Sequence, residues 1–312
     1  MTSAEEKGKW EEESSCMIPG TIVHDSLPAP DTEIHQTPII IQSDKNMNNE
    51  FWLVAAATGL VACAWLYKKG KKTYYFIRKI SRSFKTVRWD PKSTLNDGQC
   101  RKLAVGAMYA SQQGAYQNSM TTGIRDLLPR ILGEWWGIDN YMDAHKELDY
   151  LCQKGYRYYF PFICQAFLTD DPDKQDEVFQ QNMTSQEDYD KITFQFQNLE
   201  ETYDELLECK VIAGKEDLKR YGVTGWDAGR ICFLARACRE MNYITEEEAW
   251  QYIDIAYKMT RDAFSSWHDM AMSYIIGRSL WGGKSAYNSV MKNTADKLLS
   301  SEESPWTRYA WS

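Results

Sequence analysis

The sequence predicts an all-α protein in which a single transmembrane helix is followed by a compact multi-helix globular domain. Two observations support this fold class. Residues 51–67 form an uncharged apolar run, and from about residue 93 onward apolar residues recur at the three- and four-residue spacings of helices. Alternating β-branched runs, which are typical of strands, are absent from that second region.

The first 50 residues are polar and acidic. Residues 1–50 contain four of the nine prolines, and their 3 Lys/Arg against 10 Asp/Glu give a net charge of −7. A segment of this kind buries too little apolar surface to offset the entropy of folding. We therefore expect a disordered acidic tail.

The apolar run that follows predicts a membrane span. Residues 51–67 (FWLVAAATGLVACAWLY) have Trp52 near one end and Trp65 and Tyr67 near the other. As a helix the run would be roughly 25 Å long, the short limit for crossing a bilayer, with aromatic residues at both interfaces. The alternative is a buried core helix.

A basic juxtamembrane linker, residues 68–92, comes next. Nine Lys/Arg and no Asp/Glu lie within residues 68–88, which favours the cytoplasmic side of a membrane and contact with anionic lipid. The remaining residues, 89–312, carry 24 Lys/Arg against 34 Asp/Glu, a net of −10. This acidic charge argues against a nucleic-acid partner.

The all-α globular domain is expected over residues 93–312, where helix start signals recur. Asp139 is expected to cap a helix that ends before Gly155. The other helical segments before residue 224 are 94–113, 127–137, one that begins at Asp171-Pro172, and one from Ser185 to about Lys210. The aromatic residues of 300–312 predict that the C-terminus packs back onto the domain.

Three further helices are expected between residues 224 and 281. Each begins with a capping-box pattern, in which a Ser or Thr is followed three residues later by an acidic residue. The pairs are Thr224 with Asp227, Thr245 with Glu248, and Ser266 with Asp269. The short connection between the first two helices predicts that they pack antiparallel.

These three helices repeatedly place tryptophans beside charged residues, and the set is a candidate binding site or structural network. Its members are Trp226, Asp227, Arg230, Glu248, Trp250, Trp267, Asp269, Arg278 and Trp281. In the structural interpretation, buried ion pairs lock the helices together. In the functional one, Arg230 and Arg278 bind a carboxylate or phosphate between indole walls.

Arg278 shares a helix face with apolar residues, so its charge requires a partner. Removing one member of a buried ion pair typically costs roughly 3–5 kcal/mol. We therefore expect Asp227, Glu248 or Asp254 to lie close to Arg278.

Several ordered blocks of the sequence resemble a known family. They are WGIDN at 136–140, Gly155-Tyr156-Arg157, WDAGR at 226–230, YITEEEAW at 243–250, FSSWHD at 264–269 and GRSLW at 277–281. Over about residues 97–285 the chain resembles the bacterial domain of unknown function 1266 family, which has no established activity. Asn242 stands where members often carry Gly. With the predicted span, the resemblance implies a single-pass protein of the bacterial inner membrane, with its globular domain in the cytoplasm.

No metal site or cofactor is expected. The four histidines include no pair at ligand spacing, and the eight cysteines include no Cys-x-x-Cys pair, so the cysteines are expected to be core residues. No glycine-rich phosphate loop is present. The run Ser265 to Asp269 contains Ser, His and Asp, but neighbours within one turn cannot act in series as a triad.

Two functions remain from the sequence. The first is a membrane-tethered cytoplasmic binding or adaptor module that recruits a protein partner. The second is an enzyme or small-ligand sensor that binds an anionic group through a cleft between Arg230 and Arg278. An adaptor should expose an apolar patch. An enzyme or sensor should have a concave pocket that both arginines reach.

Overall fold

The computed structural model describes residues 87–169 and 171–311, all within one compact unit, 81–312. The expected disordered tail (1–50) and transmembrane helix (51–67) lie outside the described residues. So does the expected basic linker up to residue 86.

The described unit contains helices and no strands, so the all-α part of the predicted fold class is confirmed. The transmembrane part requires a correction, because none of the helices within 87–169 and 171–311 combines the length and the apolar character needed to cross a bilayer. Most of these helices bury one side against the domain and keep charge on the other, and the two enclosed helices, α10 and α12, contain buried charged or polar residues. Even α8, the longest, exposes Glu187 and Glu201 to solvent.

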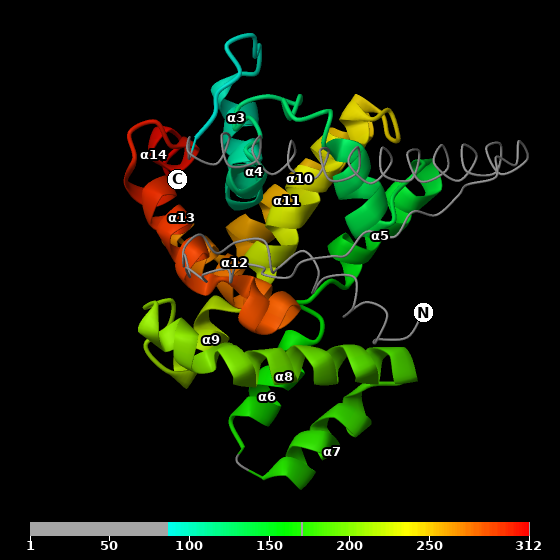
Figure 1. The fold of residues 1–312 in the computed structure, drawn as a ribbon, viewed down its shortest axis with the longest axis vertical. Coiled ribbons are helices and arrows are strands. Elements are labelled where there is room, and N and C mark those ends of the chain that lie inside the picture. Colours follow the sequence, from blue (N-terminus) through cyan, green and yellow to red (C-terminus); the bar gives the residue numbers. More distant parts are fainter. Residues whose placement is uncertain (1–86, 170, 312) are drawn as a thin grey trace, which may run out of the picture. The chain divides into compact units, whose positions relative to one another are not determined.

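Figure 1 shows the order of the elements. They are α3 (Asp97–Leu103), η1 (Ala104–Gly106), α4 (Ala107–Gln113), the π-helical turn η2 (Arg130–Trp135), α5 (Tyr141–Gln153), α6 (Phe160–Phe167), α7 (Pro172–Asn182), α8 (Gln186–Glu208), α9 (Lys215–Tyr221), α10 (Thr224–Glu240), α11 (Glu246–Ala263), α12 (Trp267–Gly282), η3 (Gly283–Ala286), α13 (Asn288–Ser300) and α14 (Pro305–Arg308).

Helix α10 is the centre of the unit. It packs against α11 and α12, and α5, α4 and η1 cover its other sides. Helix α8 packs against α12, with α7 beyond it (Figure 1). Almost every residue of α10 is buried, as expected for a helix enclosed on all sides. Glycines permit this close packing, because a Cβ on Gly229 would meet the Tyr274 ring at 2.9 Å.

The predicted capping residues are partly confirmed. Thr245 and Glu248 form a full capping box at α11, and the Ser266 hydroxyl accepts from the Asp269 N–H at 3.1 Å. Asp171 and Ser185 cap α7 and α8 as expected. Two predictions were wrong. Asn140, not Asp139, caps α5, and Thr224 does not cap α10, since the helix already includes it.

The turn between α10 and α11 contains Asn242 with φ of +61°. Left-handed backbone of this kind favours glycine, and asparagine tolerates it better than most other residues. This conformation accounts for Asn242 in the turn, where a β-branched or bulky residue would be strained.

Two ends of the described chain are anchored. Trp306 is buried, donates from its indole N–H to the Ala104 carbonyl at 2.8 Å and stacks on Trp267, so the prediction that the C-terminus packs back is confirmed. At the other end, an isolated bridge joins Arg88 to Tyr116, and the Arg88 carbonyl accepts from the Gln117 N–H at 2.8 Å.

Candidate functional site

Asp227 is the centre of a buried charge network. Its side chain is fully buried, and its carboxylate accepts from the backbone N–H groups of Tyr156 (3.1 Å) and Arg157 (3.0 Å). It also pairs with the guanidinium groups of Arg157 (3.2 Å) and Arg230 (2.5 Å). Asp227 therefore joins α10 to the turn that follows α5. The expected capping box would instead have used its carboxylate within the first turn of α10.

Arg230 completes this network from within the core. Its side chain is 5% exposed, and its guanidinium lies over the rings of Trp226 (4.6 Å), Tyr156 (4.8 Å) and Trp136 (5.6 Å). A guanidinium paired with a carboxylate and enclosed by aromatic faces is a stable buried arrangement. For Asp227 and Arg230 the geometry supports the structural interpretation.

Arg278 lies in a different environment. It is half-buried on α12, donates from Nε to the Ala286 carbonyl at 2.9 Å and lies 5.3 Å from the centre of the Trp281 ring. The Trp281 and Trp226 rings are 6.1 Å apart, so the two arginines flank an aromatic pair. Burial lowers the pKa of Arg278, because a partly desolvated guanidinium is less stable when charged.

The prediction that a carboxylate lies close to Arg278 was wrong. Among the residues that the structure describes, no carboxylate forms an ion pair with Arg278, and each of the three candidates is engaged elsewhere. Asp227 is bound by Arg157 and Arg230, Glu248 closes the capping box of α11, and Asp254 pairs with Lys102 at 2.5 Å.

Glu248 and Trp250 lie at a second place, the start of α11. Glu248 Oε1 is 3.3 Å from His145 Nε2 on α5, and the hydrogen bonds that Glu248 accepts from Thr245 lower its pKa. His145 Nδ1 contacts the Tyr252 hydroxyl at 2.7 Å, which donates to Asp149 at 2.7 Å. Trp250 packs against the core without a described polar contact.

Sequence reasoning missed this hydrogen-bonded row between α5 and α11. A signal was available, since His145 and Asp149 are four residues apart, as are Glu248 and Tyr252. Two such pairs mark one face of each helix. The missing information was that these two faces meet.

Trp267 and Asp269 lie at a third place, the start of α12. The Trp267 indole N–H donates to the Tyr309 carbonyl at 2.9 Å, and Asp269 accepts from the Ser265 hydroxyl at 3.1 Å. Both residues attach α12 to neighbouring segments. The nine candidate residues thus occupy three places, in one of which Arg230 and Arg278 flank the Trp226 and Trp281 rings.

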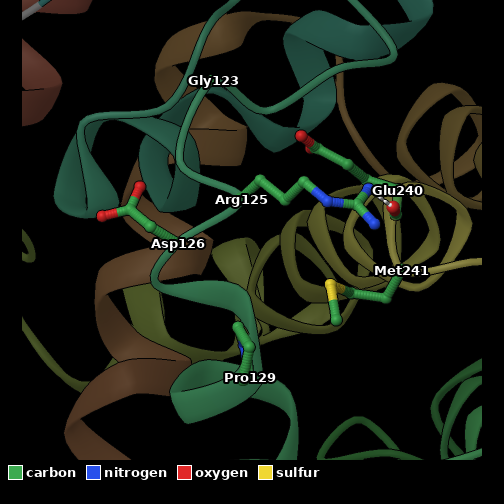
Figure 2. A pocket seen from close by; sticks show the side chains of 6 residues that line it. All are labelled: Gly123, Arg125, Asp126, Pro129, Glu240 and Met241. Carbon is green, nitrogen blue, oxygen red and sulfur yellow. Dashed lines mark hydrogen bonds between the residues drawn. The ribbon is translucent and has the colours of Figure 1, made fainter.

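An open pocket of about 600 Å³ lies at the C-terminal end of α10 (Figure 2). Its lining residues are Gly123, Arg125, Asp126, Pro129, Glu240 and Met241. The Arg125 side chain extends across the pocket and donates to the main-chain carbonyl of Glu240. The Glu240 carboxylate turns the other way and accepts from the N–H and hydroxyl of Thr122, both at 2.6 Å. Neither Arg230 nor Arg278 lines this pocket.

Exposed apolar residues at the start of α5 are linked to the first turn of α11, which follows the pocket residue Met241 in the chain. Tyr141 is 51% exposed and Met142 is 72% exposed, at the start of α5. The Tyr141 hydroxyl donates to Glu248 at 3.3 Å, and Met241, seven residues before Glu248, lines the pocket. We call Tyr141, Met142 and the six pocket residues the turn face.

Comparison with known proteins gives one match. No curated protein and no solved structure matches the chain significantly. Residues 131–311, more than half of the 312 residues, match the model of a family described as "Protein of unknown function (DUF1266)". The resemblance seen in the sequence blocks is therefore confirmed. The matched region begins later and ends closer to the C-terminus than the expected 97–285.

Proposed function

Since the chain belongs to the DUF1266 family of proteins of unknown function, we propose a role from geometry alone: the helical domain is a binding module that docks a partner protein on the turn face. The observations that carry this proposal are the open pocket at the C-terminal end of α10 and the two exposed apolar residues at the start of α5, of which Tyr141 bonds Glu248 in the first turn of α11. Solvated apolar side chains next to a hollow are typical of protein interaction sites.

The chemistry of the turn face indicates what it would accept. Pro129 and Met241 provide apolar walls for an apolar side chain of the partner, and methionine adapts its shape to different partners. The Arg125 guanidinium lines the pocket, and a guanidinium has five N–H groups, so beside its bond to the Glu240 carbonyl it can donate to a partner carbonyl or carboxylate. These features suit an apolar residue carried on an exposed segment of polypeptide.

The overall charge favours a basic partner. Residues 89–312 carry 24 Lys/Arg and 34 Asp/Glu, so the domain attracts a positively charged protein surface over the range of the Debye length. Complementary charge mainly raises the association rate. Binding should therefore weaken as salt concentration rises.

The proposal can be tested by photo-crosslinking in cells, with a photoreactive residue at Met142 of the full chain. The partner protein identified by the crosslink is then purified, and its affinity for the full chain is measured directly. Met142→Asp and Arg125→Glu should each weaken binding by about tenfold or more, which corresponds to about 1.4 kcal/mol. Val290→Asp is the matched control, because Val290 is also an exposed apolar residue, at 49%, but lies on α13.

Equal affinity of the Met142→Asp and Val290→Asp proteins would contradict the proposal. So would a purified partner whose binding is unaffected by both turn-face variants. The thermal stability of each variant, measured in parallel, separates loss of binding from loss of folding.

A further inference from the structure

Arg278 is distinguished from the other buried arginines by its partners. Arg157 and Arg230 share the Asp227 carboxylate. Arg236, which is fully buried, donates to the Tyr116 and Thr121 carbonyls through one nitrogen, while its Nε and Nη1 have no hydrogen-bond partner within the described residues; its nearest counter-charge is Glu240, one helical turn away. Arg278 bonds one main-chain carbonyl only, and no described carboxylate neutralises its charge.

The contacts of Arg278 hold its guanidinium in one orientation. The Ala286 carbonyl, in the turn η3 that follows α12, takes the Nε hydrogen at 2.9 Å. Trp281, one turn further along α12, lies 5.3 Å from the guanidinium carbon. Neither terminal nitrogen of Arg278 contacts an acceptor among residues 87–169 and 171–311.

A guanidinium fixed through Nε presents its two terminal N–H groups side by side. This fork matches the two oxygens of a carboxylate or phosphate group, which arginine binds bidentately. The groups that act electrostatically on Arg278 are the hydroxyls of Tyr109 and Tyr274, and η3 also carries the exposed Lys284. Two carboxylates of α8 lie beside η3, where Glu205 accepts from Asn288 at 2.8 Å and Glu201 lies against Gly283. The half-buried position of Arg278 strengthens such a contact compared with one in open water.

We propose that Arg278, against the indole of Trp281, binds the carboxylate or phosphate group of a small-molecule ligand. This anion site is separate from the turn face, which has none of these residues. It retains one half of the cleft expected from the sequence, because Arg230 is occupied by Asp227 and only Arg278 has a free edge.

The test uses the purified full chain and two probes, inorganic phosphate and acetate, at constant ionic strength maintained with sodium chloride. Binding is followed by indole fluorescence and by the NMR signal of the Arg278 Nε–H group. At least one probe should produce saturable changes in the wild type. Arg278→Gln should abolish them, and Arg278→Lys should weaken them by about tenfold, because lysine keeps the charge but lacks the planar fork.

Arg308→Gln is the matched control. Arg308 is exposed and also lies over a tryptophan, at 4.2 Å from the Trp89 ring, so it tests whether any arginine beside an indole gives the same signal. This variant should bind as the wild type does. A response to phosphate alone would identify a phosphate site, and a response to acetate alone a carboxylate site.

Absence of saturable binding of both probes by the folded wild type would overturn the proposal. Equal loss of binding in the Arg278→Gln and Arg308→Gln proteins would also overturn it. If Arg278→Gln lowers the melting temperature strongly, the Arg278→Lys protein decides, since unchanged affinity in that variant contradicts bidentate recognition.

Discussion

Gly155 lies directly against the carboxylate of Asp227, so closely that a Cβ on Gly155 would overlap both carboxylate oxygens. Gly155 has φ of +55°, and this backbone turns the N–H groups of the next two residues toward the same carboxylate. The Gly155-Tyr156-Arg157 block and the WDAGR block are therefore two halves of one contact. A side chain at Gly155 would force them apart.

Replacement of Gly155 by alanine should destabilise the domain by more than its backbone conformation alone explains. Gly137 is the control, because it has φ of +65° but a Cβ added there would meet no atom within 4 Å. Gly137→Ala should lower the free energy of unfolding by about 1 kcal/mol, because alanine is strained in the left-handed backbone conformation. Gly155→Ala should lower it by about 2 kcal/mol more, because its Cβ also overlaps the Asp227 carboxylate. Urea denaturation measures both. Equal losses would refute the close contact with Asp227.

Asp227→Asn should be among the most destabilising single substitutions. It leaves Arg157 and Arg230 without a counter-charge in a buried site, which typically costs about 3–5 kcal/mol. Asp269→Asn is a matched change at a half-buried position that faces the exposed Arg220 at 3.6 Å, and should cost less than about 1 kcal/mol. Comparable unfolding free energies for the two variants would be inconsistent with the network.

Substitution of Arg230 and of Arg278 by alanine should lower the free energy of unfolding by different amounts in the same assay. Arg230→Ala leaves the buried Asp227 with one guanidinium fewer, and we expect a loss of about 3 kcal/mol. Arg278→Ala removes a hydrogen bond to a main-chain carbonyl and strands no charged partner, so about 1 kcal/mol is expected. If Arg278→Ala lowered the unfolding free energy more than Arg230→Ala does, the assignment of Arg230 to the structural network and of Arg278 to ligand binding would be contradicted.

Buried thiols predict a loss of stability at alkaline pH. Burial raises the pKa of the Cys238 thiol from 9.0 to about 12, because the thiolate is poorly solvated in the core. The unfolded chain thus releases this proton at lower pH than the folded one. The contribution is complete below about pH 9 and is lost as pH rises toward 12.

The Cys238→Ala protein isolates this effect. Between pH 9 and 11, its unfolding free energy should fall less steeply with pH than that of the wild type. The difference in slope should correspond to about one proton released on unfolding. Urea titrations at several pH values measure the difference. Parallel pH dependences of the two proteins would mean that Cys238 ionises alike in both states.

Local signals in the sequence predicted local structure well. The capping box of Thr245 and Glu248 formed as expected, because its donors and acceptors lie within one turn. The same pattern failed for Thr224 and Asp227, since Asp227 takes partners that lie about seventy positions away in the chain. A pattern of four residues contains no information about such distant competitors.

The candidate site shows the same limit. Helical spacing correctly placed Arg230 at the border of the core, and it correctly put Arg278 among apolar neighbours. It did not reveal that Asp254 would pair with Lys102. Periodicity assigns a side chain to a face of its helix, but the choice of partner depends on how the helices are packed against one another.

The bridge between Arg88 and Tyr116 has a mechanical consequence. Arg88 bonds Gln117 through its carbonyl and Gly114 through its guanidinium, and Arg236 of α10 in turn donates to the Tyr116 carbonyl at 2.6 Å. Tension in the chain ahead of residue 87 is therefore borne first by this bridge. From there one path leads through the buried Arg236 into the central helix. A second leads through the Trp89 indole, which donates to the Glu303 carbonyl at 2.8 Å, into the segment that follows α13.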